Sequence, residues 1–133
     1  MRQNTIALVY DFGGTLIPKT MQEYTILPKL KISSKRFWAA ILKESRMTDG
    51  EIMMIYMRQL INHANSINYN LTKNEFSRLA SKIKYFNGVT TWFKNINNYI
   101  YKNHKGIRIK HYVISAGHNE ILESISIRKH LSN

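Results

Sequence analysis

The chain has 133 residues, 44% of them hydrophobic, which is enough for one globular domain with a hydrophobic core. It has no cysteine, which excludes disulfide bonds and thiolate metal sites, and no long apolar run, so we expect a cytoplasmic protein without a signal peptide or membrane span. The formal net charge of +12 favours an anionic partner, such as a phosphorylated compound, a nucleic acid or a membrane surface.

Residues 5–10 predict a short buried strand, because they are apolar and partly β-branched and a glycine turn follows them. Asp11 stands at the end of this strand, directly before the turn that contains Gly13 and Gly14. Turn glycines expose backbone N–H groups that can cradle a phosphate, and a carboxylate beside them can serve as a nucleophile or a metal ligand. The alternative is that Asp11 only caps a turn or a helix.

Residues 19–85 have a helical pattern and carry 12 basic and 5 acidic residues, a net charge of +7. We predict three helices here. The first follows a serine cap at Ser33 or Ser34, and T-x-x-E capping boxes at Thr48 and Thr72 start the other two. A group of methionines in the second helix is expected to fill the core rather than to form an adaptable binding surface. Its members are Met47, Met53, Met54 and Met57.

The last part of the chain predicts a helix, a strand and a further helix. Residues 89–104 have an amphipathic pattern that stops before Gly106, residues 107–115 form a mostly apolar strand that ends at Ser115, and residues 116–125 turn into a helix. The basic run within residues 101–111 is expected to be a solvated face. His118 is expected to be a solvated loop residue.

The order of elements, with a helical block between the first strand and the rest, predicts an α/β fold with a helical insertion. In an open parallel sheet, sites form where strands end, so Asp11 and Ser115 are expected to lie at one edge. A carboxylate can attack phosphorus and form an acyl phosphate, while a hydroxyl and N–H groups hold the phosphoryl oxygens. Mg²⁺, which prefers oxygen ligands, would offset the charge repulsion.

Two segments resemble a known family. "VYDFGGTL" resembles the first motif of the haloacid dehalogenase-like (HAD) hydrolases, usually D-x-D-G-T-L, and "YVISAG" resembles their second motif. The helical block resembles the cap that many members insert, and the phosphoserine-phosphatase-like branch is the most similar. The resemblance implies a partial Rossmann-like core in residues 1–18 and 86–133, with a helical cap in residues 19–85.

The resemblance also implies a magnesium-dependent phosphatase that acts on a small phosphorylated substrate through an aspartyl-phosphate. Asp11 would be the nucleophile and a ligand of Mg²⁺, and the backbone carbonyl of Gly13 would be a second ligand. The residues that would bind phosphate are Gly14, Thr15, Ser115, Ala116 and Gly117.

Two departures from the family pattern are expected to leave the enzyme impaired or inactive. Gly13 stands where the family has a second aspartate, which protonates the leaving group and later activates water. Such general acid–base assistance is worth about 10²–10⁴ in rate. The family's later motifs, a basic residue and further acids, are not found in residues 116–133, so we expect a truncated core.

The alternative function is a non-catalytic protein that binds a phosphorylated ligand or an acidic partner. An incomplete core would leave a hydrophobic sheet edge bare, so self-association or a partner chain is expected to cover it. We expect no membrane partner. We do not expect nucleic-acid binding either, because the sequence has no helix-turn-helix, RNP or zinc-finger pattern.

Overall fold

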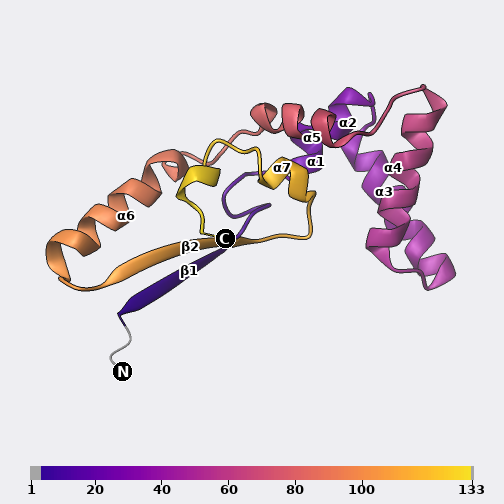
Figure 1. The fold of residues 1–133 in the computed structure, drawn as a ribbon. Helices are drawn as coiled ribbons and strands as arrows, with labels where there is room; N and C mark the ends of the chain where they lie inside the picture. Colours follow the sequence, from indigo (N-terminus) through magenta and orange to yellow (C-terminus); the bar gives the residue numbers. More distant parts are fainter. Residues whose placement is uncertain (1–3, 133) are drawn as a thin grey trace.

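The structure is a computed structural model that describes residues 4–132 (Figure 1). Within these residues the chain forms a mixed α/β fold with a small parallel sheet, as the sequence predicts. In chain order the elements are β1 (Thr5–Asp11), α1 (Met21–Tyr24), α2 (Ile26–Lys29), α3 (Ser34–Thr48), α4 (Ile52–Ser66), α5 (Lys73–Leu79), η1 (Ala80–Lys82), α6 (Val89–Asn103), β2 (Arg108–Ile114), α7 (Asn119–Leu122) and η2 (Arg128–His130), where η denotes a 3₁₀ helix.

Strands β1 and β2 pair in parallel, although about 100 residues separate them in the sequence. The register sets Thr5 opposite Arg108 and Asp11 opposite Ile114. Parallel pairing brings the carboxyl ends of both strands to one edge, where Asp11 ends β1 and Ser115 directly follows β2. The fold therefore provides the strand-end arrangement that the sequence predicts.

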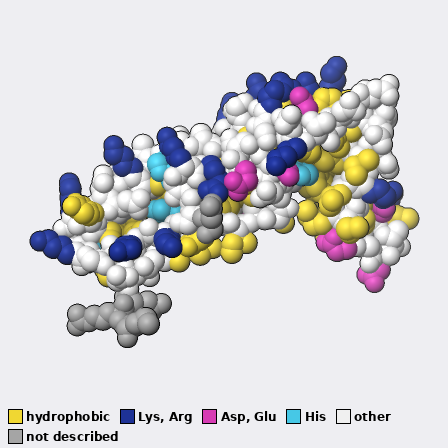
Figure 2. Space-filling view, in the orientation of Figure 1, with side chains coloured by type: hydrophobic (Ala, Val, Ile, Leu, Met, Phe, Trp, Pro, Cys, Tyr) yellow, Lys and Arg dark blue, Asp and Glu magenta, His cyan; other side chains and the backbone are white. Residues whose placement is uncertain are grey.

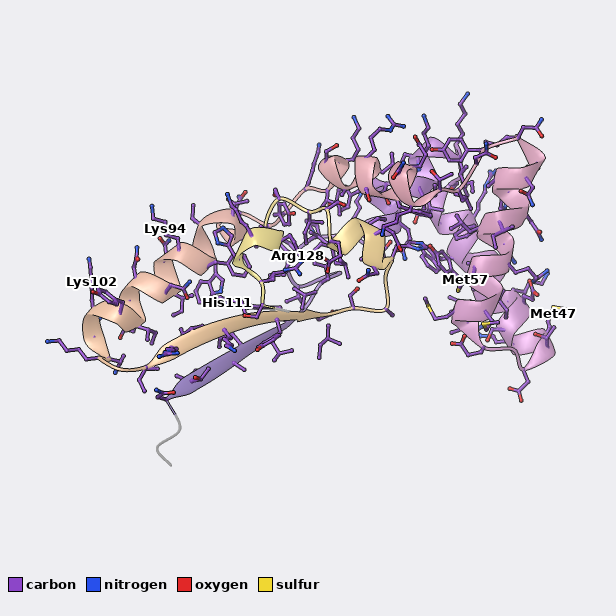
Figure 3. The ribbon with its side chains drawn as sticks, viewed as in Figure 1. Met47, Met57, Lys94, Lys102, His111 and Arg128 are labelled. Atoms are coloured by element: carbon purple, nitrogen blue, oxygen red, sulfur yellow. The ribbon has the colours of Figure 1, made fainter. Side chains whose placement is uncertain are left out.

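Helices α6 and α7 lie on one side of the two strands (Figure 1). His111 points from β2 toward α6 (Figure 3), where its Nε2 lies 2.9 Å from Asn97 Oδ1 and its Nδ1 lies 2.9 Å from the Tyr10 hydroxyl. Trp92 of α6 donates its indole N–H to the same hydroxyl at 2.9 Å. This network fixes both strands against the helix.

The opposite side of the strands is exposed and only partly apolar, because Thr5, Arg108 and Lys110 lie on it beside Val9 and Ile114. Residues that alternate along the strands point there, and Val9 and Ile114 keep 54% and 69% of their surface exposed. The structure thus leaves a hydrophobic part of the sheet bare within residues 4–132. Coverage of it by a second copy or by another chain stays a prediction.

The buried apolar residues form two clusters. One joins the loop after β1 to α6 and the C-terminal segment, and it includes Phe12, Ile17, Phe93 and Ile121. The other is formed within residues 26–79, chiefly between α3 and α4. Phe76 of α5 packs against both clusters, so α5 connects them. The predicted domain boundaries at residues 19 and 85 stay a prediction.

The capping box predicted at Thr48 is wrong. Helix α3 continues through Thr48, whose hydroxyl donates to the Glu44 carbonyl at 2.9 Å, and it ends at Asp49 in the left-handed region (φ 51°). Helix α4 instead has Glu51 as its N-cap, whose carboxylate accepts the Met54 N–H at 2.9 Å. At Thr72 the predicted cap is present, since its side chain accepts the Glu75 N–H.

The methionines are mostly not in the core. Met47 on α3 is 75% exposed. Met54 and Met57 on α4 are 68% and 48% exposed, because the buried face of α4 is formed by Ile55, Tyr56, Leu60 and Ala64. Met47 and Met57 lie at the α3–α4 end (Figure 3), where Figure 2 shows hydrophobic surface. The basic run is solvated at its lysines and arginine as predicted, and Figure 2 shows basic side chains spread over the α6–β2 end.

Candidate active site

A cleft of about 220 Å³ lies at the carboxyl ends of the two strands. Six residues from the two motifs line it, which are Asp11, Phe12, Gly13, Ser115, Ala116 and Gly117. We call this the strand-end cleft. Five of the seven predicted site residues are therefore brought together, although they come from opposite ends of the sequence.

The loop after β1 is fixed by its own backbone. The Phe12 carbonyl accepts N–H groups from Thr15, Leu16 and Ile17, and the Phe12 ring is fully buried. The Gly14 N–H donates to the Ile17 carbonyl at 2.7 Å. The amides of Gly14 and Thr15 are thus already bonded, and neither residue lines the strand-end cleft. Their predicted role in phosphate binding stays a prediction.

Gly13 lines the strand-end cleft, and the space beside it can accommodate a side chain. A Cβ atom built on it would lie 3.8 Å from both the Lys19 carbonyl oxygen and Thr20 Cα, which is ordinary van der Waals contact. Its φ angle also lies outside the left-handed region, unlike that of Gly14 at 79°. Neither space nor backbone conformation requires glycine at this position.

The loop after β2 is shaped by Ser115 and by a contact with α1. The Ser115 hydroxyl oxygen accepts the Gly117 N–H at 3.1 Å, so its own proton remains available for another acceptor. A Cβ atom on Gly117 would lie 2.0 Å from the Met21 methyl group, so Gly117 makes room for this side chain. Met21 in turn accepts the His118 N–H on its sulfur at 3.2 Å.

His118 is not a solvated loop residue, contrary to the sequence expectation. Its Nε2 lies 2.6 Å from the Tyr56 hydroxyl, and its ring stacks on Phe76 with centroids 4.5 Å apart. Tyr56 lies 62 positions earlier in the chain, so no local pattern could have indicated this partner. His118 connects the loop after β2 to helices α4 and α5.

Burial also changes the ionisation of this pair. It lowers the pKa of His118 below its ordinary value, although the negative charge of Glu120 acts to raise that pKa. Burial raises the pKa of Tyr56 to about 12, against a hydrogen bond with Gln22 that acts in the opposite direction. His118 is therefore held as the neutral imidazole at physiological pH.

We expect the free energy of unfolding to fall as the pH is lowered from 7.5 to 5.5. Burial lowers the pKa of both His111 and His118 in the folded chain, and His130 adds to the effect at His111. The unfolded chain then binds more protons than the folded chain once the pH passes below about 6.5, which favours unfolding. Urea titrations at several pH values would measure this, with the exposed His104 replaced by asparagine as control. Stability that is constant or higher at pH 5.5 would contradict the expectation.

The remaining wall of the strand-end cleft comes from the helical block, namely Thr20, Met21, Gln22, Trp38 and Met53. The entrance to this block is fixed by Glu23, whose carboxylate accepts the Thr20 N–H at 3.0 Å and the Ser34 hydroxyl at 2.8 Å. Sequence reasoning missed all five wall residues. Helical periodicity marks a buried face, but it does not show what that face meets.

The oxygen atoms at the strand ends are of the kind that Mg²⁺ prefers. Asp11 is exposed and makes no ion pair within residues 4–132, and no hydrogen bond in that range uses the Gly13 carbonyl. Mg²⁺ takes few protein ligands and retains several waters, so one carboxylate and one carbonyl fit it. No group of three or more metal-ligating side chains gathers among the described residues.

A larger hollow of about 500 Å³ borders the C-terminal segment, but Glu123 and Arg128 in its wall pair with each other at 2.9 Å. The strand-end cleft combines an unpaired carboxylate with a hydroxyl and turn amides. It is therefore the better candidate for chemistry on a ligand.

Comparison with known proteins gives one distant relative. A protein of Borreliella burgdorferi, described as uncharacterized, is 26% identical over 140 residues, which cover 98% of this chain and 48% of that protein. The chain thus spans about half the length of the relative it matches. No family model and no solved structure matches the sequence. Among the described residues, no helix has both the length and the apolar character needed to cross a membrane.

Proposed function

We propose that the chain is a HAD-like domain that binds a small phosphomonoester in the strand-end cleft and transfers the phosphoryl group to Asp11, with impaired turnover. The observation that carries this proposal is the convergence of Asp11 and Ser115, from segments about 100 residues apart, on one cleft that the helical block closes. The function is that of a magnesium-dependent phosphatase of the cytoplasm.

The fold supports this reading. Two parallel strands joined through helices are the unit from which a Rossmann-like sheet is built, and sites in such sheets lie at the carboxyl ends of the strands. One hydrophobic cluster joins the loop after β1 to the C-terminal third of the chain, and the other lies within residues 26–79. This division supports a partial core with a helical cap inserted after the first strand.

In the proposed reaction the Asp11 carboxylate attacks phosphorus. A bond forms between a carboxylate oxygen and phosphorus, the ester bond breaks, and the alcohol leaves with a proton taken from water. Water then hydrolyses the acyl phosphate, which restores Asp11 and releases phosphate. The Ser115 hydroxyl and the Ala116 N–H hold the phosphoryl oxygens by donating hydrogen bonds. Mg²⁺, held by Asp11 and the Gly13 carbonyl, would offset the repulsion between carboxylate and phosphate.

A second candidate function is binding without turnover. It is favoured by Gly13, which offers no acid to the leaving group. A protein of this kind would hold a phosphorylated ligand at the Ser115 hydroxyl and the Ala116 amide and release it unchanged.

Replacing Asp11 by asparagine is expected to abolish hydrolysis of p-nitrophenyl phosphate and to maintain or strengthen the binding of inorganic phosphate, because the carboxylate that repels the anion is lost. Release of p-nitrophenol and calorimetric titration with phosphate measure the two effects. Asp49→Asn is the matched control, because Asp49 is exposed and lies at the end of α3.

The outcome separates the two candidates. Hydrolysis in the original chain that Asp11→Asn removes and Asp49→Asn leaves supports the phosphatase. Phosphate binding without any turnover supports the second candidate. Hydrolysis that survives in Asp11→Asn, or the absence of phosphate binding in every variant, would contradict the phosphoryl site altogether.

A further inference from the structure

The wall that the helical block contributes to the strand-end cleft carries no charge. It consists of Thr20, Met21, Gln22, Trp38 and Met53, so among residues 4–132 only Asp11 lines the cleft with an ionisable side chain. A substituent on a bound phosphate would face this wall. A carboxylate or an ammonium group on that substituent would lose water there without gaining a partner of opposite charge.

Trp38 is held rigidly in this wall. Its ring stacks on Tyr56 with centroids 5.3 Å apart and planes at 17°, and its other neighbour Phe37 lies edge-on at 5.5 Å. Tyr56 covers one face of the indole, and the part of the Trp38 side chain left free by this stacking lines the strand-end cleft. The thioethers of Met21 and Met53 complete the wall with polarisable atoms.

The indole N–H of Trp38 is buried and has no hydrogen-bond partner within residues 4–132. Buried donors in native structures nearly always have an acceptor, so an unpaired one calls for an explanation. The nitrogen has almost no accessible surface, so the indole offers its ring rather than this N–H to a ligand in the strand-end cleft.

The absence of an acid at position 13 limits which leaving groups can depart, and this argument does not depend on the wall of the cleft. Without a proton donor, the departing oxygen must leave as an anion or take its proton from water. A phenolic oxygen, with a pKa of about 10, leaves far more readily in this way than the oxygen of an aliphatic alcohol. The chemistry at Gly13 and the aromatic wall therefore favour the same kind of substrate.

We infer that the wall at Trp38 is a subsite for a flat, uncharged aromatic substituent, so that the substrate class is the aryl phosphates. This inference rests on the proposed function. A cleft of about 220 Å³ has room for one phosphoryl group and one ring. This subsite also disfavours phosphoserine, because none of the described residues that line the cleft is a cation that could pair with an amino-acid carboxylate.

The test measures equilibrium binding of phenyl phosphate, O-phosphoserine and inorganic phosphate by calorimetry, in the Asp11→Asn background so that nothing is turned over. We expect phenyl phosphate to bind about tenfold more tightly than O-phosphoserine. In Trp38→Leu the affinity ratio of phenyl phosphate to inorganic phosphate should fall about tenfold, and in Trp38→Phe, which retains a ring without the N–H, it should fall less. Tyr101→Phe, at an aromatic residue of α6 that is 82% exposed and does not line the strand-end cleft, is the control.

The outcomes are distinguishable. If inorganic phosphate does not bind, the proposed function and this inference both fail. If phosphate binds but phenyl phosphate has no advantage over O-phosphoserine, the subsite is overturned while the phosphate site stands. The comparison of the three ligands needs no substitution at Trp38, so the inference can be overturned even if Trp38→Leu does not fold.

Discussion

Replacing Gly13 by aspartate is expected to raise the rate of phosphomonoester hydrolysis by about 10²–10⁴-fold. The new carboxyl group would stand at the border of the strand-end cleft, where it could protonate the leaving oxygen and later take a proton from water. The structure accommodates it, because a Cβ atom at Gly13 meets its nearest neighbours at 3.8 Å and the backbone is not left-handed. The rate constant kcat, measured with an aryl and an alkyl phosphate, checks the prediction.

The size of the gain should depend on the leaving group. An alkyl phosphate, whose alkoxide needs a proton, should gain more than an aryl phosphate, whose phenolate does not. Gly13→Asn is the control, since it has nearly the same shape and polarity but no acid. An equal gain in Gly13→Asn would show that the side chain acts by binding alone, and no gain in Gly13→Asp would exclude position 13 as the site of the missing acid.

The strand ends could be predicted because their signals are local and their geometry is general. An apolar run before Asp11 and another before Ser115 indicate strands, and parallel strands bring their carboxyl ends to one edge of a sheet. The structure confirms this pairing and joins both residues in one cleft. The identity of the bound ligand and the chemistry at Asp11 depend on no such rule and stay predictions.

The wall of the strand-end cleft could not be predicted, because it depends on contacts between distant segments. Trp38 follows the helical pattern of α3, but only tertiary packing brings it to the same cleft as Ser115. His118 was expected in solvent because its partner Tyr56 lies on another helix. Helices α1 and α2 were missed for a different reason, since four residues are too few to show a period.

The capping rule also predicted a wrong helix boundary at Thr48, where a second local interaction competes with it. The T-x-x-E pattern at Thr48 satisfies the capping rule, but the hydroxyl of Thr48 bonds backward to the Glu44 carbonyl and the helix continues. Asp49, which can adopt the left-handed conformation, then ends α3, and Glu51 takes over the cap of α4. A capping pattern therefore marks the neighbourhood of a helix boundary, whereas the backbone conformation of the next residue decides its position.

Replacing Phe93 by alanine is expected to lower the free energy of unfolding by about 3–5 kcal/mol. Its side chain is fully buried and lies against three rings, with centroids 5.7 Å from Tyr10, 5.0 Å from His111 and 5.3 Å from His130. Since domains of this size are stable by only about 5–15 kcal/mol, the variant would retain little stability. Urea denaturation followed by near-ultraviolet circular dichroism measures the loss.

Tyr101→Ala on the same helix is the matched control, because its side chain is 82% exposed and its removal should change stability by less than about 0.5 kcal/mol. Equal losses in the two variants would mean that α6 is not anchored through Phe93. The site is coupled to this anchor, because Tyr10, which the Phe93 ring contacts, directly precedes Asp11 in β1. Phe93→Ala should therefore weaken phosphate binding even in conditions where the chain stays folded, and Tyr101→Ala should not.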